Sequence, residues 1–378
     1  MGRIKPGVDL YSRRILIEAG SRIMPDWLRF VHGVVDSEDI PLNISRESMQ
    51  DSALMKRLKT VLTRRVLRFL EGEARADGER YNKRFFGEFG NFLKEGAVTD
   101  ATYAADIARL LRFESSALPA GQLTSFDEYV SRMGPGQAAV YYLVAPHRGI
   151  AESSPYMEAF KGGAATAAAG AGAGGGGGDV EVLFLYSPLD DFVMNNLREV
   201  NGRKLMTAES AELDATKLKG VDINAPAAKA EGGGADAAAA AKGEASLEPL
   251  TEAQVGELGA WLQSVLPKRL SKVRATTRLR SSPAVVTDHE SAAIRRMMRM
   301  VEASAGRDSE SLRGDAHMLP PQTLEVNPAH PVIVKLHAMR ATDERTAKLV
   351  AEQLLDLSLI HISEPTRLRR ISYAVFCL

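Results

Sequence analysis

Two stretches composed almost entirely of glycine and alanine interrupt this sequence and limit what the chain can fold into. Residues 162–178 read GGAATAAAGAGAGGGGG, and residues 222–246 contain APAAKAEGGGADAAAAAKGEAS. Side chains this small bury too little apolar surface to offset the entropy lost on ordering. We therefore expect both stretches to be mobile, the first as an enlarged surface loop within a domain and the second as a linker between domains.

The overall charge balance restricts the partners of the chain. The 378 residues include 48 basic and 48 acidic side chains, so the formal net charge is zero. Binding to nucleic acid or to a membrane surface relies on an excess of Lys and Arg, so we expect neither partner. The sequence contains no run of 18 apolar residues that could span a bilayer. A single cysteine excludes an intrachain disulfide and a metal site built from cysteines.

Apolar periodicity predicts mixed α/β structure before residue 162. Between Leu54 and Leu70 the apolar side chains recur at steps of 4, 3, 1, 4, 3 and 1, which marks one face of a helix. A second, aromatic-rich stripe from Tyr81 to Leu93 predicts another helix. Further helices are predicted at 104–111 and 190–197, and strands at 8–17, 28–35, 138–144, 180–186 and 204–207.

The sequence after the second stretch predicts a further α/β region. Helices are predicted at 252–265, 291–304, 331–340 and 343–355, and strands at 272–279 and 284–287. Three carboxylates, Asp36, Glu38 and Asp39, lie close together before the first long helix. We expect them to form a solvated turn, and we expect no metal site, because the histidines lack ligand spacing.

The final 22 residues do not resemble a protein segment. Residues 357–378 read LSLIHISEPTRLRRISYAVFCL, which is similar to a translated sequencing adaptor of the transposase type. We therefore interpret 357–378 as an artefact that contains the only cysteine, Cys377, and that cuts the preceding domain short near Asp356. A genuine basic and apolar tail is the alternative interpretation.

Several motifs occur in a consistent order along the chain. They are GVVDSEDIPLNISRE at 33–47, LLRFESSALPAGQLTSFDEYVSRM at 110–133, VYYLVAP at 140–146, EVLFLYSPLDDF at 181–192 and LEVNPAHP at 324–331. Together they resemble the middle and C-terminal domains of the heat shock protein 90 family of molecular chaperones. The segments SSALPAGQLTS and LYSRRILI are most similar to the mitochondrial, TRAP-type members. The resemblance covers nearly all of residues 7–356 apart from the two glycine- and alanine-rich stretches.

The resemblance implies a domain organisation. Layered αβα subdomains joined by a helical connector would form a partial middle domain at 1–221. A low-complexity linker would occupy 222–246, and a truncated, mixed α/β C-terminal dimerisation domain would occupy 247–356. We expect the family's N-terminal nucleotide domain, which holds ATP and Mg²⁺, to be missing from this chain. On that expectation the fragment alone is inactive as an ATPase.

The resemblance also implies a function for the parent protein. It would be an ATP-dependent molecular chaperone that binds unfolded or partly folded client proteins, contacts its own N-terminal ATPase domain and works as a homodimer. Similarity to the TRAP-type members implies a mitochondrial location, with cytoplasm or plastid as alternatives. A client-binding scaffold that does not use nucleotide is the alternative function.

The segment LNISRESMQ at 42–50 contains the candidate catalytic residue. Ser45 suits an N-cap, which places Arg46 in the first helical turn, where a cation opposes the helix dipole. A helix N-terminus and a guanidinium together suit an anion. On the residues alone, a surface arginine paired with Glu47 or Asp51 is the simpler interpretation. The match of LNISRESMQ to the chaperone motif favours the first interpretation, in which Arg46 binds an anion.

The resemblance implies that Arg46 reaches the γ-phosphate of ATP and that Asn43 and Gln50 are its polar neighbours in ATP binding. A second candidate site lies on the helix predicted at 291–304, which carries three methionines among arginines. Methionine is flexible and polarizable and recurs on surfaces that accept many partners. An ordinary core stripe is the alternative, whereas the resemblance implies a client-binding segment. The three residues are Met297, Met298 and Met300.

Overall fold

The computed structural model describes residues 7–38, 53–134, 137–161, 179–210, 248–267, 269–287 and 321–360. Both glycine- and alanine-rich stretches and the helix predicted at 291–304 lie outside these ranges. Residue contacts divide the chain into two compact units. Unit 1 comprises Met1–Arg132 and Ser187–Leu205, and unit 2 comprises Met133–Tyr186 and Met206–Leu378. The predicted boundaries at 221 and 247 fall outside the described residues and stay a prediction.

Unit 1 begins with a three-stranded sheet in the order β2–β1–β3. Strand β1 (Gly7–Ser12) pairs antiparallel with β2 (Ile15–Glu18) and parallel with β3 (His32–Asp36). The single strand predicted at 8–17 is wrong, because Arg13 and Arg14 reverse the chain with φ angles of 48° and 67°. Two consecutive positive φ angles are typical of a two-residue hairpin turn, which glycine or asparagine usually forms.

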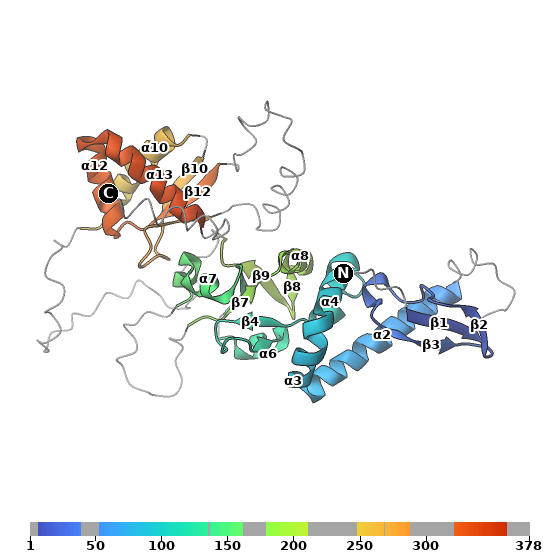
Figure 1. Ribbon diagram of the computed structural model, residues 1–378. Coiled ribbons are helices and arrows are strands. Elements are labelled where there is room, and N and C mark those ends of the chain that lie inside the picture. The colour runs from blue at the N-terminus through green and yellow to red at the C-terminus, as the bar shows by residue number, and fades with distance from the viewer. Residues whose placement is uncertain are drawn as a thin grey trace, which may run out of the picture. The chain divides into compact units, whose positions relative to one another are not determined.

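Helix α2 (Ala53–Ala76) lies against one face of this sheet (Figure 1). Alternate residues of β1 are buried, and Val8 and Leu10 are the strand's contribution to the core. Leu58 and Leu62 of α2 pack against that core, as their spacing predicts. The helix predicted from Leu54 to Leu70 is confirmed and extends further at its C-terminal end.

A second helical segment follows and packs against the short 3₁₀ helix η1 (Asp26–Leu28). Trp27 of η1 is 3% exposed and donates from Nε1 to Asp100 at 3.4 Å. The helix predicted from Tyr81 to Leu93 is confirmed, with a π-helical turn inside it. The segment consists of α3 (Gly78–Arg80), η2 (Tyr81–Phe86) and α4 (Gly87–Thr99), and α5 (Ala104–Ala108) follows.

The remaining elements of unit 1 are short, and residue patterns alone predicted only some of them. The antiparallel pair β4–β5 and helix α6 were not predicted, whereas helix α8 was. Helix α8 begins with a capping box made by Ser187 and Asp190 and contacts α4. The elements are β4 (Phe113–Ser115), β5 (Leu123–Thr124), α6 (Phe126–Arg132), α8 (Pro188–Leu197), β8 (Glu199–Val200) and β9 (Arg203–Thr207), whose last two residues belong to unit 2.

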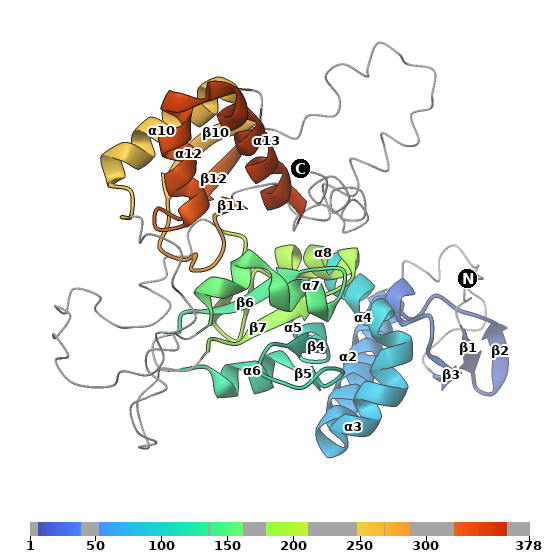
Figure 2. The same ribbon diagram turned by 60° about the vertical axis from the view of Figure 1, so that its left-hand side comes forward.

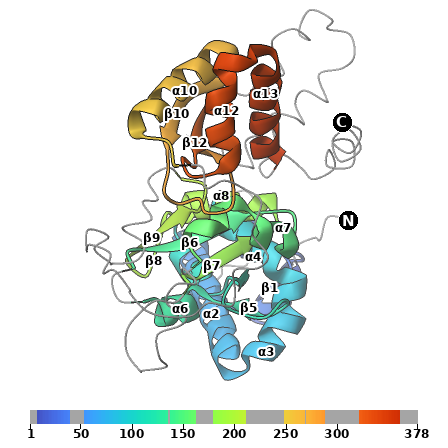
Figure 3. The same ribbon diagram turned by 90° about the vertical axis from the view of Figure 1, so that its left-hand side faces the viewer.

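The first part of unit 2 contains two parallel strands, β6 (Ala139–Val144) and β7 (Val182–Leu185), which lie side by side in Figure 3. Both strands are buried and apolar, as expected for strands covered on both faces. Helix α7 (Arg148–Ser153) and the 3₁₀ helix η3 (Pro155–Ala159) follow β6. Tyr156 and Phe160 add aromatic side chains to the same core.

The second part of unit 2 has a three-stranded sheet in the order β10–β12–β11. Strand β12 (Gln322–Val326) was not predicted, yet it pairs with both neighbours, parallel with β10 and antiparallel with β11. Helix α10 lies on β10, and α12 and α13 pack together (Figure 2). The other elements are α10 (Glu252–Val265), β10 (Leu270–Ala275), β11 (Ala284–Thr287), α12 (Pro331–Thr342) and α13 (Glu344–Ile360).

Helix α13 continues beyond the boundary predicted at 356. Ser358 is buried and donates from its hydroxyl to the Leu354 carbonyl at 2.8 Å, and Leu359 packs against the adjacent core. Residues 361–378 lie outside the described ranges, and the interpretation of 357–378 as an adaptor stays a prediction. The expectation of a mixed α/β fold is confirmed by the helices and mixed sheets of both units.

Candidate functional site

The residues predicted to carry function lie outside the described residues. The candidates for ATP contact fall in 39–52, between the end of β3 and the start of α2, and the candidates for client contact fall in 288–320, between β11 and β12. Their roles stay predictions. The residues concerned are Asn43, Arg46, Gln50, Met297, Met298 and Met300.

The N-terminal part of α2 is strongly cationic. Helix α2 contains seven Lys and Arg residues and two Glu, and its first turn holds no acidic residue. Because the N-terminus of a helix already carries partial positive charge, acidic side chains normally stabilise it. Lys56, Arg57 and Lys59 occupy the first two turns instead. This arrangement raises the local positive potential near the segment that contains Arg46.

A cavity of about 300 Å³ opens beside these first turns. One wall comes from the chain that follows β2 and the other from α2. Three cations and one carboxylate line the cavity, which gives it a formal charge of +2, together with one serine and two apolar side chains. The lining residues are Glu18, Ser21, Arg22, Ile23, Met55, Lys56 and Lys59.

The cavity lies within a rigid part of unit 1. Ile23 is 2% exposed and belongs to the core between the sheet and α2. Ser21 is also 2% exposed, and its amide donates to the Val8 carbonyl at 2.8 Å. Asp9 accepts from the Gly20 amide at 2.8 Å, which fixes the turn before Ser21. These contacts hold the loop side of the cavity in place.

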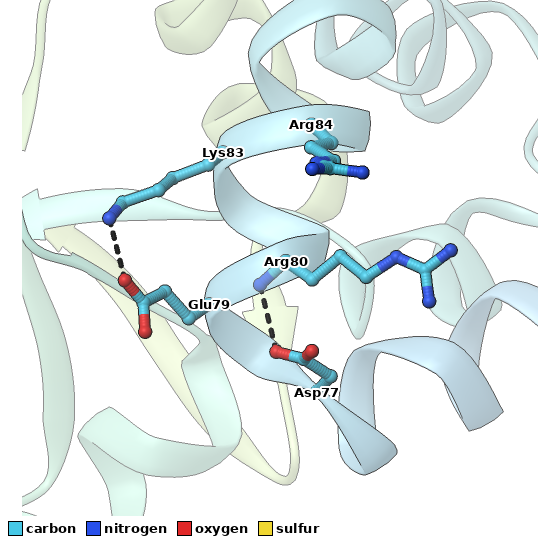
Figure 4. A pocket seen from close by; sticks show the side chains of 5 residues that line it. All are labelled: Asp77, Glu79, Arg80, Lys83 and Arg84. Carbon is cyan, nitrogen blue, oxygen red and sulfur yellow. Dashed lines mark hydrogen bonds and ion pairs between the residues drawn. The ribbon is translucent and has the colours of Figure 1, made fainter.

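A second, more open pocket of about 440 Å³ lies at the junction of α2, α3 and η2 (Figure 4). Some of its charged side chains form an ion pair or a hydrogen bond with other residues of the lining. Lys83 contacts Glu79 at 2.6 Å, and Asp77 accepts from the Arg80 amide at 2.9 Å. The side chains of Arg80 and Arg84 point to the side of the helix opposite Lys83 (Figure 4). Because the Lys83–Glu79 pair is on the surface, it contributes little to stability.

A buried ion pair stabilises the junction of α4 and α8 in unit 1. The Lys94 ammonium lies 2.6 Å from Asp190, whose side chain is 5% exposed. The same ammonium lies over the rings of Phe86 and Phe113, at 5.7 and 5.6 Å from their centroids. Asp190 also accepts from the Ser187 amide as part of the cap of α8. These contacts give Lys94 a structural role.

In unit 2, the carboxylate of Glu158 in η3 binds the turn before β11. It accepts from the amides of Arg280 and Ser281 at 2.5 and 3.0 Å and from the hydroxyls of Ser281 and Ser282 at 2.8 and 2.5 Å. Burial raises the pKa of Glu158, but these hydrogen bonds outweigh it and the net pKa lies below the ordinary value of 4.5. The carboxylate therefore joins two segments more than 100 residues apart.

A buried charge pair lies close to this turn. Arg278 and Glu325 are 4% and 6% exposed, and Arg278 Nε lies 3.1 Å from Glu325 Oε2. This is an ion-pair distance, although Nε has no hydrogen-bond partner within the described residues. Arg278 also donates to the Ser210 carbonyl at 3.0 Å, and Tyr156 donates to the Val286 carbonyl nearby. The pair connects β12 with the chain before β11.

Other site types receive no support from the part of the chain that the structure describes. No group of three or more His, Cys, Asp or Glu there could hold a metal ion. Asp36 accepts from the Arg14 amide at 3.2 Å. Among the described helices, none is long and apolar enough to cross a membrane.

A family model described as Hsp90 protein matches residues 3–364. The chain therefore belongs to the heat shock protein 90 family, and the resemblance inferred from its motifs is confirmed. Among its relatives, TNF receptor-associated protein 1 homolog, mitochondrial, of Dictyostelium discoideum is 37% identical over 364 residues, which is 95% of this chain and 44% of that protein. Heat shock protein 75 kDa, mitochondrial, of Rattus norvegicus is 40% identical over 357 residues, which is 93% of this chain and 45% of that protein.

Bacterial relatives also match. Chaperone protein HtpG of Desulfitobacterium hafniense (strain Y51) is 38% identical over 355 residues, which is 93% of this chain and 50% of that protein. The chain thus spans about half the length of the curated relatives it matches.

Proposed function

We propose that this chain is the middle and C-terminal part of an ATP-dependent molecular chaperone that binds unfolded or partly folded client proteins. The observation that carries the proposal is the family match, which extends from residue 3 to 364. Relatives over the same span are named as chaperones in bacteria and as mitochondrial heat shock proteins in animals. We extend the proposal to a homodimer in mitochondria, on the same similarity.

In this proposal Arg46 stabilises the charge that develops on the γ-phosphate, with Asn43 and Gln50 beside it. ATP and Mg²⁺ would be held by the family's N-terminal nucleotide domain. Helix α2 begins seven residues after Arg46 and packs firmly on the sheet, so it is a rigid support for the segment. The acid-free first turn of α2 adds positive potential where phosphate oxygens would approach.

The test replaces Arg46 with alanine in a protein that joins this sequence to its nucleotide domain. Removal of one preorganised donor to a phosphoryl transition state lowers the rate by about 10²–10³. We expect steady-state ATP hydrolysis to fall by about that factor, with ATP affinity within about threefold of the unmodified protein. Arg68→Ala is the matched control, because Arg68 is exposed further along the same helix and has no hydrogen bond or ion pair within the described part of the chain.

Two results would contradict this proposal. Turnover within about twofold after Arg46→Ala would reject the role of Arg46. Prevention of client aggregation that is equal with and without ATP would instead favour the nucleotide-independent scaffold. Replacement of Met297, Met298 and Met300 by serine, scored by aggregation of a heat-unfolded enzyme, tests the client site separately.

A further inference from the structure

We propose that the cavity between the β2–η1 loop and the first two turns of α2 binds a phosphate group. The cavity uses residues that the resemblance does not assign to ATP, and the inference stands whether or not the proposed ATPase function is correct. Its basis is the volume of the cavity and its excess positive charge, with one serine side chain in the lining.

The hydroxyl of Ser21 is the first element of this site. Ser21 is 2% exposed and lines the cavity, and its amide is used by the Val8 carbonyl. A serine hydroxyl can donate a hydrogen bond, and a phosphate oxygen in the cavity would accept it.

The charges of the cavity are the second element. Arg22 and Lys59 line it from opposite walls, and neither has an ion-pair partner among the described residues. Lys56 adds a third cation. Arginine and lysine are the side chains that bind phosphate, and a nearby helix N-terminus adds to their field. Glu18 is the one carboxylate of the lining and opposes an anion, so it lowers affinity.

The size of the cavity decides which phosphate compounds fit. At about 300 Å³ it lies at the lower end of small-molecule sites, which span roughly 300–1,000 Å³. Its two apolar side chains, Ile23 and Met55, offer little surface to a nucleobase. Inorganic phosphate or pyrophosphate therefore fits well, and the terminal phosphates of a nucleotide are the other source of the same chemistry.

The experiment is calorimetric titration of the 378-residue chain with pyrophosphate, with ATP and with inorganic phosphate at constant ionic strength. We expect saturable binding of one equivalent. Hydrogen bonds from cations to phosphate are among the stronger ones, so Lys59→Gln and Arg22→Gln should each weaken binding by about tenfold. Equal affinity for pyrophosphate and ATP would indicate that only the phosphates are bound, and tighter ATP binding would indicate that a nucleotide is the source.

Two variants protect this test against loss of folding. Glu18→Gln removes the repelling carboxylate and should strengthen binding several-fold, which an unfolded protein cannot do. Arg64→Gln removes the same charge from the exposed side of α2, outside the cavity, and should leave affinity within about twofold. Absence of saturable binding, or an equal loss in Arg64→Gln and Lys59→Gln, would overturn the proposal.

Discussion

Glu158→Ala removes the carboxylate that joins η3 to the turn before β11 in unit 2. The side chain receives three amide and two hydroxyl hydrogen bonds, from Arg280, Ser281 and Ser282. Hydrogen bonds to a charged group contribute about 1.5–3 kcal/mol when buried. Glu158 is partly exposed to solvent, so after mutation water replaces part of the hydrogen-bonding energy. We therefore expect the local stability to fall by about 2 kcal/mol.

Hydrogen exchange measures this loss directly, because three of the donors are backbone amides, those of Arg280 and Ser281 being the shorter contacts. At 1.4 kcal/mol per factor of ten, the opening equilibrium at Arg280 and Ser281 should rise about 30-fold. Exchange at these amides is followed by mass spectrometry of peptides from 276–288. Glu152→Ala is the matched control, because within the described residues the Glu152 carboxylate pairs with Arg148 of the same helix, at 2.6 Å, and its loss should leave those peptides unchanged.

The pH dependence has a defined sign. Because the folded-state pKa of Glu158 is below 4.5, its carboxylate stabilises the fold above pH 4.5. That stabilisation is lost as the pH falls through the folded-state pKa. The exchange difference between the two proteins should therefore shrink below pH 4.5. An exchange ratio under about twofold at neutral pH, or a difference that grows in acid, would refute this role for Glu158.

Two further predictions concern the cores. Gly96→Ala would place Cβ 2.6 Å from the Trp27 side chain, and we expect thermal unfolding to show a stability loss of about 1–3 kcal/mol. Gly72→Ala, where Cβ would meet nothing within 4 Å, should be neutral or stabilising. Equal effects of the two variants would contradict close packing at Gly96. Glu325→Gln leaves Arg278 buried without a counter-charge and should lower the free energy of unfolding, measured in urea, by about 3 kcal/mol. The double replacement Arg278→Met with Glu325→Leu removes both charges and should lower it by less. A larger loss in the double variant would contradict this reasoning.

Long elements were predictable from the sequence because their signals are repeated many times. Helix α2 shows six periodic steps, and α10 and β11 occur at the residues predicted. Short elements lack such repetition. Strands β4 and β5 have three and two residues, too few to show alternation. The turn at Arg13 and Arg14 was missed because its left-handed backbone is imposed by strand pairing and not by glycine or asparagine.

The two candidate sites differ in how they can be found. Arg46 was identified through a motif, because its residues are contiguous in LNISRESMQ. The cavity joins residues 18–23 to residues 55–59, and no pattern along the chain indicates that these segments meet. The folding of α2 onto the sheet creates the cavity, so only the structure could reveal it. Glu158 and its partners near 280 are a second case of the same kind.

The packing of helix α2 explains why lysine and arginine in its first two turns are tolerated although they destabilise the helix. Lysine and arginine at a helix N-terminus are unfavourable by a few tenths of a kcal/mol each, and like charges one turn apart add a similar penalty. The core contacts of Leu58 and Leu62 are each stronger than this penalty, so the fold tolerates the charges. A cluster that weakens the isolated fold is best explained by an anion that it binds. The phosphate titration tests that explanation at the first two turns of α2, and the Arg46 variant tests it at Arg46.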